Sequence, residues 1–313
     1  MAVHRVSGLS LAADIPLPEL PRARGAAADC RFRLLPPRRP AGGPPAWLHR
    51  WRRDNRSAWI SLGRTRRGYL LRFAGVADFL LSRDGSVIFG CPRPGVPALT
   101  IRHLLLDQVL PMVLAHRGHL ALHASAVAAV GGALAFAGKT GWGKSTLCAS
   151  LARAGGPPLA DDCLVIEERR GRAVAVPSYP GLRLWPDSAR ALSRGRLGGT
   201  PVADYSDKRR LNPDHLSARR PAATPLRAIY VLAAPGTAKK VRISRLAPRE
   251  AVGRLLAHTH RLDVTDRVRL AAELEALSRL ASRVPVFELC FPHDLGRLAA
   301  IRAAVLRHAT AEL

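Results

Sequence analysis

The segment ALAFAGKTGWGKST, residues 133–146, indicates the fold class most directly. The apolar run at 133–136 predicts a buried β-strand, and the residues from Thr146 onward have the composition of a helix. Between them, residues 138–145 match the Walker A pattern GxxxxGK[ST] in full. Strand, glycine loop and helix in this order predict a nucleotide-binding loop in an α/β domain.

Each residue type in this loop has a physical reason. Its glycines let the backbone curl so that successive N–H groups point at phosphate oxygens, and the helix that follows presents its positive end. Lys144 is expected to reach the β- and γ-phosphates, and the Ser145 hydroxyl to ligate Mg²⁺. We expect ATP and Mg²⁺ as cofactors, with nucleotide contacts from Gly138, Lys139, Thr140, Gly141, Trp142, Gly143, Lys144, Ser145 and Thr146.

Two adjacent carboxylates, Asp161 and Asp162, lie in LADDCLVI, 17 residues after Lys144. On an extended segment their side chains leave on opposite sides, so one can face a metal and the other an acceptor or a histidine. Phosphoryl transfer with Mg²⁺ needs a carboxylate here. Upstream, His123 in LHASAV could orient one Asp or share its proton near neutral pH, although a purely structural histidine is the alternative.

Together, LHASAV, GKTGWGKS and LADD resemble the HPr kinase/phosphorylase family of P-loop serine kinases, strongly over residues 120–166 and loosely over 167–310. The segments VSGLSLAADIPLPEL and RHLLLDQVLPMVLAHRG resemble one branch of HPr kinase-like proteins. That branch includes kinases encoded with lasso-peptide biosynthesis genes, which phosphorylate a serine at the C-terminus of the precursor.

The resemblance implies an ATP-dependent serine kinase in which Asp161 takes the proton of the acceptor hydroxyl. Asp162 would be linked to Mg²⁺ and to His123. The bifunctional members carry an ExRG segment after the Asp pair, whereas PSYPGLRLW (177–185) contains no Glu, which argues against phosphorolysis. Arg183 in this stretch, and Lys208 and Arg209 in SDKRRLN, are candidate substrate or phosphate contacts, with plain surface charge as the alternative.

The rest of the chain predicts two domains. Residues 1–99 form a smaller β-rich N-terminal domain, and residues 100–313 a P-loop kinase domain of the HPr kinase type, with a linking helix at 100–117. Pro111 predicts a kink or an early break in that helix. In the first domain strands are expected at 6–13, 58–62, 69–73 and 86–89, and a Pro/Gly loop at 36–47. In the second, strands are expected at 120–130, 132–137, 159–166, 173–176, 182–185, 226–232, 241–246 and 286–291, helices at 146–154, 248–281 and 294–309, and a polar loop at 187–223.

Composition limits the compartment and the partners. The 313 residues carry a net charge of +26, but only 5 of the 49 basic residues are lysines, so a GC-rich coding sequence explains the arginine excess as well as a polyanion partner does. Aromatic residues are 5%, and no nucleic-acid motif is present, so nucleic acid is not an expected partner. The 5 scattered cysteines form no CxxC pair, and neither a secretory signal nor an apolar run of about 20 residues is evident, which predicts a cytoplasmic protein without a membrane span.

Three functions remain open from the sequence. They are a serine kinase acting on a protein or peptide, a kinase of a small molecule, and a non-catalytic nucleotide-binding sensor or scaffold. The presence of both Asp161 and Asp162 favours catalysis, and the basic charge with a separate β-rich domain favours a peptide acceptor. The sequence leaves the oligomeric state open, a homo-oligomer included.

Overall fold

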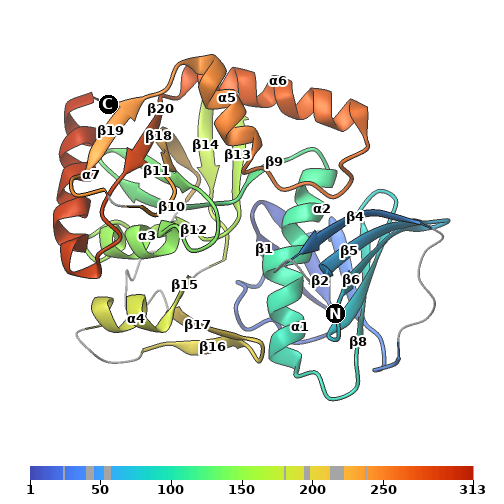
Figure 1. Ribbon diagram of the computed structural model, residues 1–313. Coiled ribbons are helices and arrows are strands. Elements are labelled where there is room, and N and C mark those ends of the chain that lie inside the picture. Colours follow the sequence, from blue (N-terminus) through green and yellow to red (C-terminus); the bar gives the residue numbers. More distant parts are fainter. Residues whose placement is uncertain are drawn as a thin grey trace. The chain divides into compact units, whose positions relative to one another are not determined.

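The computed structural model describes residues 1–23, 25–39, 46–52, 58–179, 181–193, 198–211, 222–236 and 238–312. They form a mixed α/β protein that divides into two compact units (Figure 1). Unit 1 comprises residues 1–118, 203–205 and 261–270, and unit 2 comprises 119–202, 206–260 and 271–313. The helix expected to belong with the second domain therefore lies in unit 1.

Unit 1 is built on an eight-stranded sheet in the order β1-β2-β3-β8-β7-β6-β5-β4. The strands predicted at 58–62, 69–73 and 86–89 are confirmed, whereas the one predicted at 6–13 is wrong. That region is a hairpin, because Ser7 and Gly8 have φ of 47° and 83° and form a two-residue turn. The predicted loop 36–47 lies partly outside the described residues. The strands are β1 (Ala2–Val6), β2 (Leu9–Ala13), β3 (Cys30–Leu34), β4 (Trp47–Arg52), β5 (Ala58–Thr65), β6 (Gly68–Phe73), β7 (Ala77–Ser82) and β8 (Val87–Pro92).

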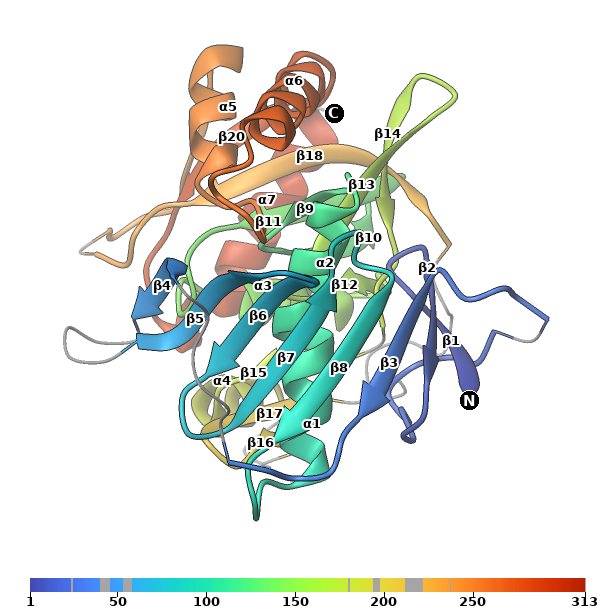
Figure 2. The same ribbon diagram turned by 90° about the vertical axis from the view of Figure 1, so that its right-hand side faces the viewer.

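One helical segment crosses a face of this sheet (Figure 2). It runs through α1 (Ala98–Leu104), a π-helical turn (Leu105–Val109) and α2 (Leu110–His116). Of the kink or early break expected at Pro111, the early break does not occur, because α2 continues to His116. The wider π turn shifts the hydrogen-bond register just before Pro111, whose nitrogen cannot donate. By length and composition Ala98–His116 could cross a membrane, but 72% of its most apolar window is buried, as in a core helix.

Unit 2 is built on a nine-stranded sheet covered by helices on both faces (Figure 1). In β11, Leu134 and Phe136 pack with α3 and α7, whereas Ala133 and Ala135 pack with α5 and α6. Large side chains thus lie on one face of a fully buried strand and small ones on the other. The helices are α3 (Lys144–Ala152), α5 (Pro248–Leu256), α6 (Arg267–Arg283) and α7 (Leu298–Glu312).

The sheet of unit 2 follows the order β12-β10-β11-β18-β14-β13-β9, with β20 paired to β18 and to β19. The strands predicted at 132–137, 173–176, 226–232 and 286–291 are confirmed. β11 runs parallel to β18, and β18 parallel to β20. The strands are β9 (Leu120–Leu122), β10 (Ala124–Ala129), β11 (Gly132–Ala137), β12 (Pro158–Ala160), β13 (Leu164–Arg169), β14 (Arg172–Val176), β18 (Thr224–Leu232), β19 (Arg242–Arg245) and β20 (Val286–Cys290).

Two predicted strands are each interrupted once. The strand expected at 120–130 is divided at His123 into β9 and β10, and the one expected at 159–166 is divided at 161–163 into β12 and β13. β9 pairs with β13, whereas β10 pairs with β12. Each half of one segment therefore pairs with one half of the other, and both segments are interrupted where these pairings change. His123 and the Asp pair lie at the two interruptions, with His123 Nδ1 3.1 Å from Asp162 O.

Two other expectations are corrected. The helix expected at 248–281 is two helices, α5 and α6, separated by a turn. In that turn the Asp263 carboxylate accepts hydrogen bonds from the backbone N and from the Oγ1 of Thr265. The expected loop 187–223 includes most of α4 (Pro186–Leu192) and the strands β16 (Thr200–Ala203) and β17 (Ser206–Leu211). These strands pair in the order β15-β17-β16 with β15 (Leu182–Leu184). Residues 194–197 and 212–221 of that stretch lie outside the described residues.

Candidate functional site

The glycine loop (residues 138–145) connects the end of β11 to the start of α3. Gly141 and Gly143 have φ of 85° and 95°, in the left-handed region that favours glycine. Because Gly143 is the N-cap, α3 begins at Lys144, and the positive end of the helix lies inside the loop. An anion placed here would meet backbone N–H groups and a helix N-terminus together.

The Lys144 ammonium is buried and donates hydrogen bonds to three acceptors. Its Nζ donates to Gly138 O at 2.7 Å, to Lys139 O at 3.1 Å and to His123 Nε2 at 3.0 Å. Burial lowers the pKa of Lys144. All three donors are used within the protein, so a phosphate that binds Lys144 must replace at least one of these bonds.

Asp161 is buried and joins the glycine loop to β15. Its Oδ1 accepts hydrogen bonds from Ser145 Oγ at 2.7 Å and from Ser125 Oγ at 2.6 Å. Its Oδ2 accepts from the backbone N of Arg183 at 2.7 Å and lies 3.4 Å from the Arg183 Nε. Both carboxylate oxygens are therefore used in fixing the loop hydroxyl and the adjacent strand.

Asp162 has a different environment. Its φ of 60° is unusual for a residue with a side chain, and its carboxylate, 18% exposed, lines a cavity. Oδ2 lies 3.5 Å from Arg183 Nε and 3.9 Å from Lys208 Nζ. Burial would raise the pKa of Asp162, but Lys208 and Arg183 outweigh it and hold the pKa well below its usual range. The carboxylate is ionised at neutral pH.

Two histidines hold the backbone of Asp162 in this conformation. His123 Nδ1 donates to Asp162 O at 3.1 Å, and His260 Nε2 donates to the same oxygen at 3.0 Å. Burial lowers the pKa of His123 to about 3 and also lowers that of His260, so both rings are neutral at pH 7. With its proton on Nδ1, His123 offers Nε2 as the acceptor for Lys144, and so links the carboxylate segment to the glycine loop.

His260 is a site residue that sequence reasoning missed, since it fell inside the expected helix 248–281. His123 N donates to His258 O at 2.6 Å, and His260 N donates to Ala121 O at 2.9 Å. The chain after α5 therefore lies antiparallel to β9 and delivers His260 to Asp162. The run HTHRLD, with histidines two residues apart before turn-forming side chains, was the available signal.

We expect His260→Leu to lower the free energy of unfolding by about 1 kcal/mol, the contribution of one net hydrogen bond. His260→Gln keeps an N–H donor near the position of Nε2 and should recover most of that loss. Urea unfolding of the two variants measures the difference. Equal stability of His260→Leu and the parent protein would show that the bond to Asp162 O contributes nothing.

The cavity lined by Asp162 has a volume of about 330 Å³ and lies within unit 2. Arg183 and Lys208 line the end nearest Asp162. Arg183 is buried, donates to Tyr179 OH and to Asp161 O, and lies over the Tyr179 ring. Lys208 Nζ lies 5.6 Å from the centre of the Trp185 ring. Two of the three candidate cations are therefore at the site.

Arg209 is not among the cavity residues. Its guanidinium donates to the carbonyl oxygens of Gly198 and Gly199, so its role in the structure is to hold the turn before β16. Of the expected nucleotide contacts, those that line the cavity are Thr140, Gly141, Gly143, Lys144, Ser145 and Thr146. Gly138 and Lys139 instead provide carbonyl oxygens to Lys144, and Trp142 lies beneath the Lys139 ammonium.

The donor set fits Mg²⁺ better than a transition metal. Among the described residues, no group of three or more His, Cys, Asp or Glu side chains is arranged to hold a metal ion. Mg²⁺ needs no such cage, because it binds through one or two carboxylates, keeps several waters and takes further oxygens from substrate phosphates. The Ser145 hydroxyl and the carboxylates of Asp161 and Asp162 supply oxygen ligands of this kind.

Comparison with known proteins adds little to this geometry. No family model matches the chain, and no curated protein matches it. Among the solved structures that match is the HPr(Ser) kinase/phosphatase from Coxiella burnetii, 11% identical, covering 60% of this chain and 89% of that chain with a TM-score of 0.32. This likeness is too distant to carry a functional argument, which must come from the site itself.

Proposed function

We propose that this protein is an ATP- and Mg²⁺-dependent kinase that transfers the γ-phosphoryl group to a serine hydroxyl of a peptide or protein. One observation carries the proposal. The loop hydroxyl Ser145 Oγ lies 2.7 Å from Asp161 Oδ1, while the ionised carboxylate of the next residue, Asp162, faces the cavity. A carboxylate hydrogen-bonded to the loop hydroxyl and a second one facing the cavity can supply the metal-holding group and the proton acceptor that kinases use.

In this proposal the glycine loop and Lys144 bind the phosphates. Ser145 and Asp161 are the residues that would hold Mg²⁺ directly or through water, with Asp162 close by. The ion supplies positive charge to the phosphate oxygens when it is bound. Ser125 keeps Asp161 in place by donating to the same oxygen that accepts from Ser145, so the ligand geometry is set in advance.

Asp162 is our candidate for the base, in contrast to the role that the family resemblance implies for Asp161. Both oxygens of Asp161 already accept hydrogen bonds, whereas the Asp162 carboxylate lines the cavity, where an acceptor can reach it. A serine hydroxyl entering beside Asp162 can pass its proton to this carboxylate as the phosphoryl group arrives. Arg183 and Lys208 then neutralise charge on the transferred group from the same side.

The acceptor we propose is a peptide. Trp185, 41% exposed, lines the cavity beside Lys208, where it can pack against an acceptor chain. The net charge of +26 favours an acidic partner over a basic one. The resemblance to kinases encoded with lasso-peptide genes makes a precursor peptide with a C-terminal serine the first substrate to try, with the reaction in the cytoplasm.

The test is transfer of ³²P from [γ-³²P]ATP to a serine peptide in the presence of Mg²⁺, with the same peptide carrying Ala in place of Ser as the matched control. We expect label on the serine peptide only, and phosphoserine by mass spectrometry. Binding of ATP without transfer to any serine peptide would favour the sensor function instead. Transfer to a small hydroxyl compound at a higher rate would identify a small-molecule kinase.

A further inference from the structure

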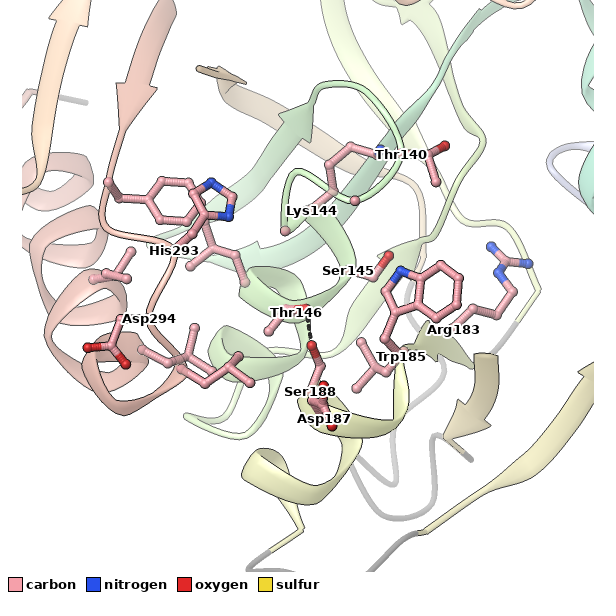
Figure 3. A pocket seen from close by; sticks show the side chains of 18 of the residues that line it. Thr140, Lys144, Ser145, Thr146, Arg183, Trp185, Asp187, Ser188, His293 and Asp294 are labelled. Atoms are coloured by element: carbon pink, nitrogen blue, oxygen red, sulfur yellow. Dashed lines mark hydrogen bonds between the residues drawn. The ribbon is translucent and has the colours of Figure 1, made fainter. Parts of the chain in front are cut away.

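The end of the cavity away from Asp162 is lined by aromatic and apolar side chains, with the exposed carboxylate of Asp294 among them (Figure 3). Phe291 and His293 follow β20, and their rings are stacked at 4.8 Å between centroids with an interplanar angle of 16°. A Cβ placed on Gly143 would lie 3.4 Å from the Phe291 ring and 4.0 Å from the His293 ring. The stacked pair therefore adjoins the glycine loop directly.

We call the stacked pair Phe291 and His293 the platform. One of its two rings remains accessible from the cavity. Phe291 is buried, whereas His293 is exposed and lines the cavity. Burial lowers the pKa of His293, so the ring is neutral at pH 7. Leu295, 39% exposed, and Leu298 continue the apolar wall. Exposed apolar side chains gathered in a cavity indicate a place where a flat apolar group binds.

The two ends of the cavity differ in chemistry. Asp162, Arg183 and Lys208 lie together at one end and the platform lies at the other, with the glycine loop and Lys144 between them. Figure 3 shows His293 and Arg183 on opposite sides of the start of α3. A ligand whose phosphates occupy the glycine loop would therefore extend away from Asp162 toward the platform.

We propose that the platform of His293 and Phe291 binds the base of the phosphoryl donor, which makes that donor a nucleoside triphosphate rather than an inorganic polyphosphate. This inference rests on the proposed function and names the donor class of the same site. Base stacking on an aromatic side chain is sequence-tolerant and needs no hydrogen-bond code. An acceptor side chain is a poorer occupant, because its hydroxyl must reach Asp162 at the other end.

The experiment is calorimetric titration of the full chain with ATP and with tripolyphosphate, each with Mg²⁺ and with no acceptor present. The parent protein should bind ATP at least about 10-fold more tightly than tripolyphosphate. His293→Ala should weaken ATP binding by about 10-fold while tripolyphosphate binding changes less than about 2-fold. His293→Phe keeps a stacking face without a titratable nitrogen and should bind ATP within about 3-fold of the parent protein.

The outcomes separate this inference from the proposed function. If the parent protein bound tripolyphosphate as tightly as ATP, or if His293→Ala weakened both ligands equally or neither, the platform would not be the base site. If the parent protein bound neither ligand, the nucleotide site itself, and with it the proposed function, would fail. Tripolyphosphate affinity in each variant also reports whether the glycine loop remains folded.

Discussion

Asp162→Asn is expected to lower phosphoryl transfer by about 100-fold or more while ATP still binds. The amide keeps the volume of the side chain but cannot take the proton of the serine hydroxyl. Loss of the negative charge beside Lys208 and Arg183 should leave ATP affinity unchanged or raise it, because both cations become more available to phosphate. Single-turnover transfer and ATP titration on the same sample measure the two effects separately.

Asp161→Asn is the matched comparison for that variant. It also replaces a carboxylate by an amide, but at the residue that accepts from Ser145, Ser125 and Arg183. We expect a shift of the Mg²⁺ titration to higher concentration and a loss of stability, because the amide nitrogen cannot accept from all of these donors. If Asp161→Asn lost transfer with normal Mg²⁺ dependence and Asp162→Asn kept it, the roles of the two residues would be the reverse of those proposed here.

Lys144→Ala is expected to weaken ATP binding by about 100-fold, the contribution of a charge-assisted hydrogen bond to phosphate. The substitution also leaves Gly138 O, Lys139 O and His123 Nε2 without their shared donor. The glycine loop thereby loses the hydrogen bonds that connect its end to its start. Calorimetric titration with ATP and Mg²⁺ measures the loss. Lys240→Ala, which removes an exposed lysine of the same unit, is the control and should bind ATP as the parent protein does.

The Lys144→Ala variant also tests whether the glycine loop binds phosphate at all. If Lys144→Ala bound ATP within about 2-fold of the parent protein, no phosphate would be held at residues 138–145. A circular dichroism spectrum and a melting curve of the variant distinguish a lost contact from a lost fold.

The part of the site predicted from sequence is the part that is local in the chain. Residues 133–146 predict strand, loop and helix by themselves, because the apolar run, the glycines and the helix-forming residues are adjacent. The sequence also suggested that His123 lies close to the Asp pair, since both are near the ends of expected strands. Sequence did not predict the break of each strand at these residues, which depends on the exchange of partners between β9, β10, β12 and β13.

Residues that come from far along the chain were missed for a different reason. His260 reaches Asp162 because its segment pairs with β9, a contact between residues more than 100 apart that periodicity does not report. His293 lies between the strand expected at 286–291 and the helix expected at 294–309, where no motif in the sequence points to a function. The short strand β17 was expected to be loop, since its polar side chains do not alternate with apolar ones, although it brings Lys208 to the cavity.

The most direct test of the central claim is phosphoryl transfer from [γ-³²P]ATP to a serine peptide by the parent protein and by Asp162→Asn under identical Mg²⁺ and ATP concentrations. We expect phosphoserine with the parent protein and at least about 100-fold slower transfer with Asp162→Asn, at equal ATP occupancy. Transfer at the parent rate by Asp162→Asn would show that Asp162 is not the base, and no transfer to serine by a parent protein that binds ATP would show that it is not a serine kinase.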